Sequence, residues 1–564
     1  MSRDGFGVTR REVLIGGAGG LALAAVEAAR AEAQGAPGAT VSGVVFEDRD
    51  GSGAPGAANR GLAGVLVSNG RDVAVTDADG RYSLPLPDEA TIFVVKPKGF
   101  MPPLDPSTRL PRFYRHHQPM GSPASLDLMF EGLAPTGAMP ASLDFPLVRQ
   151  EEPDAFEAVM ITDPQPENEA EVDFVREDLI EALENVDAKF GLDAGDIMFD
   201  DLSLYPRLNA ILGSTGLTWW SVGGNHDLNF EAPSRKLSRE TYKRFFGPTY
   251  YAFFYGPALF LMLDDVDYLG PDPTKPLGAG KYEGRIDEAQ LDFIRNVLMH
   301  APDETLIVAV MHIPIRTFLG DEPYQNLVNR DALFRLLEGR KHTVSFAGHT
   351  HTTEHHYFGP ADGWNGAEPH HHHVLTALSG SWWSGPFDHR GVASADSRDG
   401  APNGFHILSI DGTSYTTRYV PAKEPNGRQM RLSILSRFHG IAKESDLELR
   451  QPRTLGSPVP AAALGASTLV ANVFDGGERT KVTMTIGERA PVAMSRQSRP
   501  DPFVEEVFAR HEQTKKAWVK AENASHVWVA RLPGDLAPGA HRVAVEAVDE
   551  YGRKISGRLA LEVA

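Results

Sequence analysis

Residues 155 to 351 alternate between apolar segments typical of buried strands and segments with the period of an amphipathic helix. EAVMI at 157–161 is almost wholly apolar, and EVDFVREDLIEALENV at 171–186 follows it with apolar residues three and four positions apart. The same alternation continues to HTVSFAG at 342–348. Strands that alternate with helices favour a layered α/β domain. The fold class predicted for this region is therefore α/β.

Five of the apolar segments end at residues that can bind a metal, usually beside Gly or Pro. In chain order these residues are Asp163 and Gln165 (MITDPQ), Asp196 (DAGD), Asn225 and His226 (VGGNHD), His312 (AVMHIP), and His349 and His351 (FAGHTH). In an open α/β sheet the carboxyl ends of the strands gather at one edge, where ligands bind. Side chains spread over roughly 190 positions are therefore predicted to meet in one site.

The chain contains no cysteine, which excludes disulfides and thiolate metal sites. Any metal must be bound by imidazole, carboxylate or amide groups, which suit ions such as Zn²⁺, Fe, Mn²⁺ or Co²⁺. A purely structural zinc site is disfavoured for this set, because such sites usually include thiolates. Acidic residues outnumber basic ones by 75 to 55, so the net charge of −20 favours cations and argues against a nucleic acid duplex as a partner.

Taken in order, the motifs D-x-Q, GD, GNHD, a single His after a strand and G-H-x-H resemble those of the calcineurin-like metallophosphoesterase superfamily. The resemblance covers about 155–404 and implies a layered β-sandwich core flanked by helices. The run SGSWWSGPFDHRGVASADSRDGAPNGFHIL at 379–408 looks like the exported bacterial branch, which carries an added N-terminal β domain and a C-terminal domain.

The resemblance also implies two divalent or trivalent ions, with Mn, Fe or Zn expected, bound by seven residues. These are Asp163, Gln165 and His351 at one ion, Asn225, His312 and His349 at the other, and Asp196 between them. Many members of the superfamily have His at the position of Gln165. An amide oxygen is a neutral and weaker ligand, so this departure puts the affinity of the first ion and the preferred metal in doubt.

His226 is expected to stay outside the metal shell and to act on the leaving group as a proton donor or cation. With Asp196 and Asn225 it forms the expected catalytic set, while Asp227 supports the loop. The implied reaction is hydrolysis of a phosphate ester by hydroxide activated by two metals. The alternative is a catalytically weak binding protein on the same scaffold, which recognises an envelope glycan or a protein partner. The motifs do not distinguish monoesters from diesters.

Residues 1–35 resemble a twin-arginine export signal. They contain paired Arg10 and Arg11, an apolar run from Val13 to Val26 and the cleavage pattern AEA at 31–33. No other stretch is long and apolar enough to span a bilayer. We therefore expect a periplasmic or secreted protein with no transmembrane segment in the mature chain. The expected substrate is a small-molecule or envelope phosphate ester, and the oligomeric state is left open.

The flanking regions have the pattern of β domains. Short β-like segments at 40–130 predict a small β-sandwich that resembles carboxypeptidase regulatory-like domains. Its acidic loop at 48–53 is interpreted as an Asp/Gly turn in preference to a calcium site, because no late acidic ligand falls at the required offset. The Pro-rich stretch at 131–154 is predicted to be a linker, and 405–564 a C-terminal β-sandwich.

Several polar and aromatic residues have competing interpretations. The four histidines at 370–373, with His355 and His356, are interpreted as solvated, since neighbouring side chains on a strand point to opposite faces and cannot share one ion. Trp382 and Trp383 fit either a stacking wall beside the substrate or core packing. Asp264 and Asp265 end a strand without an evident partner and are interpreted as structural.

Overall fold

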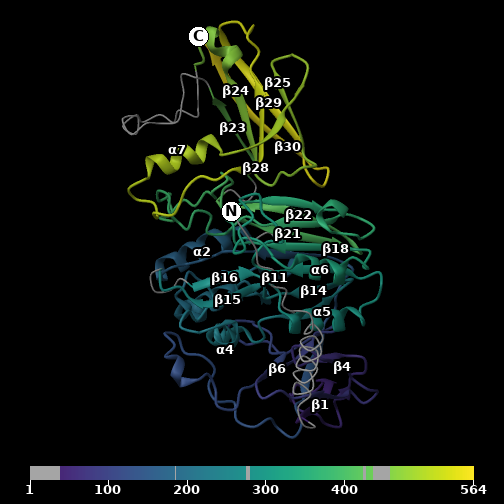
Figure 1. The fold of residues 1–564 in the computed structure, drawn as a ribbon. Coiled ribbons are helices and arrows are strands. Elements are labelled where there is room, and N and C mark those ends of the chain that lie inside the picture. The colour runs from purple at the N-terminus through teal and green to yellow at the C-terminus, as the bar shows by residue number, and fades with distance from the viewer. Residues whose placement is uncertain (1–37, 184–185, 275–279, 424–426, 436–457) are drawn as a thin grey trace, which may run out of the picture.

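The computed structural model describes residues 38–183, 186–274, 280–423, 427–435 and 458–564, so the export signal expected at 1–35 lies outside the described residues. Figure 1 shows N-terminal sheets at the bottom, a helix-flanked body in the middle and the C-terminal sheets at the top. Among the described helices, none combines the length and apolar character needed to cross a membrane.

The middle body contains two large sheets. The first has the order β12-β11-β10-β21-β22, with bounds Ala155–Ile161 (β10), Ala188–Asp193 (β11), Trp219–Ser221 (β12), Gly404–Asp411 (β21) and Ser414–Pro421 (β22). The second has the order β13-β14-β17-β18-β20-β19, with bounds Tyr251–Tyr255 (β13), Ala258–Met262 (β14), Leu306–Val310 (β17), Thr343–Ala347 (β18), Glu354–Phe358 (β19) and His370–Val374 (β20). A small hairpin pairs β15 (Val266–Pro271) with β16 (Gly280–Gly284).

Alternate side chains of β10 point to opposite faces of the first sheet, so this sheet contributes to two separate core layers. Ala158 and Met160 lie in one core cluster with residues of the second sheet such as Phe260, whereas Val159 and Ile161 lie in another. Five helices accompany the sheets: α2 (Glu169–Leu183), α3 (Tyr205–Ser214), α4 (Glu240–Phe246), α5 (Glu288–Leu298) and α6 (Arg330–Leu337). α2 and α3 pack on the outer face of the first sheet, and α5 and α6 belong to the cluster of the second. The predicted β-sandwich core flanked by helices is confirmed.

Two all-β regions flank this body. The N-terminal one has a sheet ordered β2-β1-β9-β7 with β5 on β1, and a sheet ordered β4-β3-β6-β8, which share a core. Their bounds are Thr40–Glu47 (β1), Arg60–Gly61 (β2), Leu66–Ser68 (β3), Val73–Val75 (β4), Arg81–Pro85 (β5), Ala90–Val95 (β6), Phe100–Met101 (β7), Tyr114–His117 (β8) and Phe145–Arg149 (β9). In the acidic loop, Asp48 and Asp50 accept hydrogen bonds from the backbone N–H of Gly53 and Ser52, as in a turn.

The C-terminal region is a pair of four-stranded sheets around one core, ordered β23-β24-β28-β27 and β26-β25-β29-β30. The bounds are Met430–Leu435 (β23), Thr468–Val473 (β24), Lys481–Ile486 (β25), Val492–Ala493 (β26), Ser495–Arg499 (β27), Ala524–Arg531 (β28), Gly539–Val548 (β29) and Lys554–Val563 (β30), with helix α7 at Pro502–Arg510.

Two domain boundaries in the structure differ from the predicted ones. The expected linker at 131–154 contains β9, which pairs with β1 and β7 and so belongs to the N-terminal sheet. The expected C-terminal sandwich at 405–564 includes β21 and β22, but β21 runs antiparallel to β10 within the first sheet of the middle body. That body therefore extends beyond the expected limit of 155–404 to the end of β22 at Pro421.

The prediction that the histidine tract is solvated is wrong. His370 to His373 form strand β20, which is buried between β18 and β19. Hydroxyl groups on β18 make this burial possible, because Ser345 bonds to both His370 and His372. His355 and His356 are buried as well, on β19 opposite the tract.

A buried ion pair joins the N-terminal region to the middle body. Lys96, which follows β6, donates through Nζ to Glu152 Oε1 at 2.5 Å and to the carbonyl of Phe254 at 2.8 Å. Both charged side chains are only 1% exposed. A pair removed from water in this way is sensitive to the loss of either partner.

Glu152→Ala is expected to lower the free energy of unfolding by about 3–5 kcal/mol, because Lys96 keeps a buried charge without a carboxylate. Urea unfolding followed by tryptophan fluorescence measures the change. The double variant Lys96→Met/Glu152→Leu should recover most of the loss, since apolar side chains then fill the same space. A double variant as unstable as the single one would contradict this account.

Candidate metal centre

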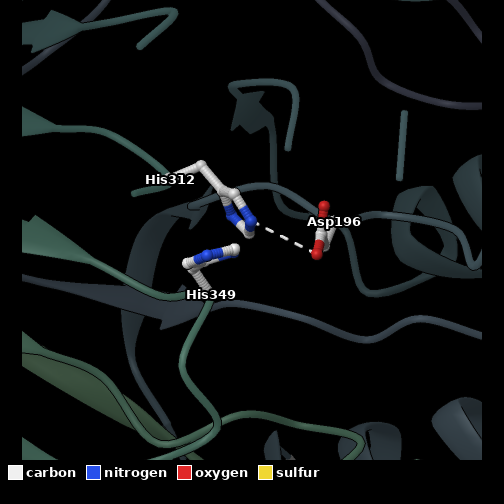
Figure 2. Close-up of side chains that lie close together, drawn as sticks. All are labelled: Asp196, His312 and His349. Carbon is white, nitrogen blue, oxygen red and sulfur yellow. Dashed lines mark ion pairs between the residues drawn. The ribbon is translucent and has the colours of Figure 1, made fainter. Parts of the chain in front are cut away.

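The predicted ligands come together at the carboxyl ends of β10, β11, β12, β17 and β18. The Nε2 atom of His312 lies 3.2 Å from Asp196 Oδ2 and 3.1 Å from Asn225 Oδ1. Figure 2 shows His312, His349 and Asp196 around one space, and their ligand atoms all lie within 4.8 Å of one another.

The other half of the site is continuous with this group. His351 Nε2 lies 3.4 Å from Asp163 Oδ1, and the side-chain amide of Gln165 donates to Asp196 Oδ2. Asp196 therefore contacts groups from both halves. Loops that are far apart in the sequence thus enclose one site, and together these seven residues are called the candidate metal centre below.

Strained backbone is concentrated in the candidate metal centre. Of ten non-glycine residues with positive φ among the described residues, five are predicted ligands: Asp163 (49°), Gln165 (38°), Asp196 (53°), His349 (75°) and His351 (52°). Left-handed backbone is unfavourable for such side chains and persists only where the surroundings impose it, which is typical of functional sites. At the cost of this unfavourable backbone, the turns direct neighbouring polar side chains into the site.

Glycines make the close approach of these loops possible. A Cβ atom on Gly224 would lie 2.1 Å from Asp196 Oδ1, and one on Gly348 would lie 1.8 Å from Thr162 Oγ1 and 2.4 Å from Asp163 Oδ2. Gly224 belongs to the GNHD motif and Gly348 to the G-H-x-H motif. The glycines of both motifs are therefore explained by contact between backbone and ligand side chains.

Three buried ligand atoms have no hydrogen-bond partner among the residues that the structure describes: Asp163 Oδ1, Gln165 Oε1 and His351 Nε2. Buried polar atoms are nearly always satisfied, so an unsatisfied group needs a reason. These three atoms belong to the residues predicted to bind the first ion. A cation bound there would satisfy all three, and the residues present fit a divalent metal.

The imidazole rings are oriented by hydrogen bonds on their far side. His312 donates from Nδ1 to the carbonyl of Ala194 at 2.9 Å, and His351 donates from Nδ1 to the carbonyl of Gly380. In the neutral form that can bind a metal, both rings therefore present an Nε2 without a proton to the site. His349 instead donates from Nε2 to the carbonyl of Tyr324 at 2.9 Å, which leaves Nδ1 for the site. Such contacts fix the tautomer of metal-binding histidines.

Buried charge in the centre favours a cation. Asp196 is 1% exposed, and although burial opposes ionisation, the charges of His312 and His226 hold its pKa far below the usual range. Burial lowers the pKa of His312, but Asp196 outweighs this effect and raises it to about 10. The carboxylates thus stabilise positive charge at this point.

Two buried acidic groups support the loops without facing the site. Asp227 accepts hydrogen bonds from the backbone N–H of Gly224 and Ile197 and from the Tyr205 hydroxyl, so it braces the GNHD loop. Asp265 accepts from the backbone N–H of His312 at 3.1 Å. Asp265 thus has the partner that sequence reasoning did not find.

The partner of Asp264 is Arg239. The two side chains meet at 3.1 Å and are each 3% exposed. Arg239 also donates to the carbonyls of Gly223, Gly224 and Asp227, so the pair clamps the backbone of the GNHD loop. Asp264 is structural, as predicted, but its role depends on an Arg that the sequence pattern did not single out.

His226 lies at the open side of the centre, with 24% of its side chain exposed. Its backbone N–H donates to Asp196 Oδ1 at 2.8 Å, and its Nδ1 lies 2.6 Å from Asp200 Oδ1. Burial lowers the pKa of His226, but the charges of Asp196 and Asp200 outweigh it and raise the pKa to about 9. His226 is thus held as a cation beside the centre, with its Nδ1–H directed at Asp200.

Aromatic side chains form a wall at the same opening. Trp382 stacks on His351 with ring centroids 3.9 Å apart, and Phe199 stacks on His226 at 4.5 Å. Trp518, from the C-terminal region, stacks on Phe199 at 5.6 Å, meets Trp382 edge-on and is 47% exposed. Sequence reasoning missed Trp518, because no local pattern connects it to a site more than a hundred residues earlier.

Each of the two interpretations of Trp382 and Trp383 holds for one of these residues. Trp382 lies at the site, whereas Trp383 is buried against Phe174 and donates its indole N–H to the carbonyl of Pro164 at 3.3 Å. Both residues have positive φ, 53° and 54°.

Similarity to solved structures is limited to weak overall superposition. A dimetal phosphatase from Danio rerio is 17% identical, with a TM-score of 0.32, over 47% of this chain and 95% of its own. The purple acid phosphatase PPD1 from seeds of yellow lupin (Lupinus luteus) is 13% identical, with a TM-score of 0.36, over 64% and 68%. No curated protein matches the chain significantly.

Family models match the chain in three consecutive parts. The model for the N terminal of calcineurin-like phosphoesterase matches 50–132, that for calcineurin-like phosphoesterase matches 159–353, and that for the C terminal of calcineurin-like phosphoesterase matches 372–555. The central match contains every residue of the candidate metal centre. The protein belongs to the calcineurin-like phosphoesterases, which are hydrolases of phosphoric ester bonds.

Proposed function

We propose that the protein hydrolyses a phosphate ester at a centre of two metal ions. The proposal rests on the convergence of seven side chains from five strand ends, with pairs of donor atoms 3.1 to 3.4 Å apart. Asp163, Gln165 and His351 would hold one ion. Asn225, His312 and His349 would hold the other, and Asp196 would lie between them. Mn, Fe or Zn suits these ligands.

When bound, the two ions would neutralise phosphate oxygens and lower the pKa of a water so that it attacks phosphorus as hydroxide. The chain's own residues supply the remaining steps. His226 approaches from the open side, where its charge stabilises the anionic transition state. It then donates the proton from Nε2 to the departing alkoxide, while Asp200 holds its Nδ1–H.

We also propose that the protein acts outside the cytoplasm on a small envelope phosphate ester. The paired arginines, apolar run and cleavage pattern of residues 1–35 support export to the periplasm or beyond. The aromatic wall of Phe199, Trp382 and Trp518 supports an ester whose leaving group is flat enough to stack.

Metal removal tests the central proposal. Protein stripped by a chelator should be inactive on an aryl phosphate monoester and an aryl phosphate diester, and reloading with Mn²⁺, Fe²⁺ or Zn²⁺ should restore activity on at least one. Asp196→Asn should lower kcat by about 10²-fold or more, because the carboxylate between the ions is lost. Two bound metals without activity on either ester would instead favour the binding protein.

Replacement of His226 separates its role from metal binding. His226→Ala should lower kcat by about 10²-fold, because proton transfer to the leaving group is lost, while the metal content stays at the wild-type level. Steady-state kinetics and elemental analysis give the two readouts. His541→Ala, at an exposed site remote from the centre in sequence, is the control. Unchanged kcat in His226→Ala would refute the assignment.

The aromatic wall predicts a selective effect on substrate binding. Trp518→Ala should raise KM for an aryl phosphate by about two- to tenfold and leave KM for a small alkyl phosphate nearly unchanged, since only the aryl group can stack. Trp518→Phe should restore most of the loss. Equal effects on both esters would show that Trp518 acts on the shape of the site rather than on the leaving group.

A further inference from the structure

A second group of metal-capable side chains lies between the middle body and the C-terminal region. It consists of His355 on β19, His373 on β20, His406 on β21 and Asp475, which follows β24, and is called the interdomain cluster below. The three imidazoles are fully buried, and the Asp475 side chain is 9% exposed. The cluster shares no residue with the candidate metal centre.

The donor atoms of the interdomain cluster have the spacing of ligands around one ion. Asp475 Oδ1 lies 3.2 Å from His355 Nε2 and 3.1 Å from His373 Nε2, and all three atoms lie within 4.8 Å of one another. Ligands at about 2.0–2.1 Å from a tetrahedral ion are roughly 3.3 Å apart. The distances also match those in the candidate metal centre.

Hydrogen bonds on the far side orient both rings. His355 Nδ1 lies 2.9 Å from His371 Nε2, and His371 Nδ1 lies 2.7 Å from the Tyr415 hydroxyl. His373 Nδ1 faces the Thr417 hydroxyl at 3.4 Å. When the protons lie on Nδ1, both Nε2 lone pairs point at Asp475, an arrangement typical of metal-binding histidines.

In that tautomer the three atoms are satisfied only by a cation between them. Two Nε2 lone pairs and an anionic oxygen repel one another at about 3 Å unless positive charge separates them. In the other tautomer each Nε2–H donates to Asp475 Oδ1, and the distances are then those of two hydrogen bonds. One divalent ion would satisfy all three atoms in the first tautomer, so bound metal distinguishes the two states.

His406 completes the surroundings. Within the described part of the chain its Nδ1 has no hydrogen-bond partner, and it lies 4.0 Å from Asp475 Oδ1, while its Nε2 accepts from the backbone N–H of Thr376 at 3.2 Å. Neutral His406 therefore carries its proton on Nδ1 and directs it toward the cluster. A donor in this position suits a water as the fourth ligand of an ion.

We propose that His355, His373 and Asp475 bind a divalent ion, with Zn²⁺ the best fit to two imidazoles and one carboxylate. Because the histidines come from the middle body and Asp475 from the C-terminal region, the ion would fasten the two together. It would thereby hold Trp518, which belongs to the same C-terminal region, at the opening of the candidate metal centre. The proposal does not depend on the proposed reaction.

Zinc binding by the full-length protein tests the proposal. Protein stripped by a chelator is loaded with Zn²⁺ alone, desalted and analysed for bound zinc. Wild type should retain about three ions, whereas Asp475→Asn and His373→Ala should each retain about two. His370→Ala is the matched control, because His370 lies on the same strand but bonds to Thr343 and Ser345. It should bind as much zinc as wild type.

Asp196→Asn distinguishes the interdomain cluster from the candidate metal centre, since it should keep the ion at Asp475 while losing zinc elsewhere. Equal zinc in wild type, Asp475→Asn and His373→Ala would overturn the proposal and leave hydrogen bonds from the two Nε2–H groups to Asp475 as the explanation of the distances. A second readout needs no variant: crystals of the wild type grown with zinc should show an anomalous peak among His355 Nε2, His373 Nε2 and Asp475 Oδ1. Peaks confined to the candidate metal centre would overturn it as well.

Discussion

The site depends on the contacts that the Asp196 carboxylate makes. One oxygen accepts the backbone N–H of His226, and the other faces His312 and the amide of Gln165. A carboxylate that is 1% exposed is stable only where positive charge and donors surround it. The same group therefore draws the turns after β10, β11, β12 and β17 together and creates the demand for a cation.

The rest of the middle body holds these turns in unfavourable conformations. Five of the seven ligands have left-handed backbone, which persists only where the surroundings impose it. The turns of the other two, Asn225 and His312, are held from outside the centre by Arg239 on the carbonyls of the GNHD loop and by Asp265 on the N–H of His312. The two stacked sheets supply the rigid base. The C-terminal region adds Trp518 at the opening, so the substrate side of the site belongs to two parts of the chain.

The features that could be predicted from the sequence are those that depend on residues close together in the chain. Metal-capable residues directly after apolar strands are a local pattern, and parallel strands bring such ends together, so the ligand set needed no tertiary information. The burial of His370 and His372 depends on Ser345, 25 and 27 residues away, and no periodicity reveals it. The pairing of β21 with β10 and the position of Trp518 are equally non-local. The strand pattern of β20 was nevertheless informative, since alternation places His371 and His373 on the face that meets Asp475 and Tyr415.

The central claim is that Asp196 lies between two metal ions at a distance short enough for the ions to interact. Electron paramagnetic resonance of the Mn²⁺-loaded protein tests it most directly, because the spins of bridged ions couple and those of separate ions do not. The account predicts the spectrum of a coupled pair in the wild type and its loss in Asp196→Asn. A wild-type spectrum that contains only isolated Mn²⁺ would contradict it.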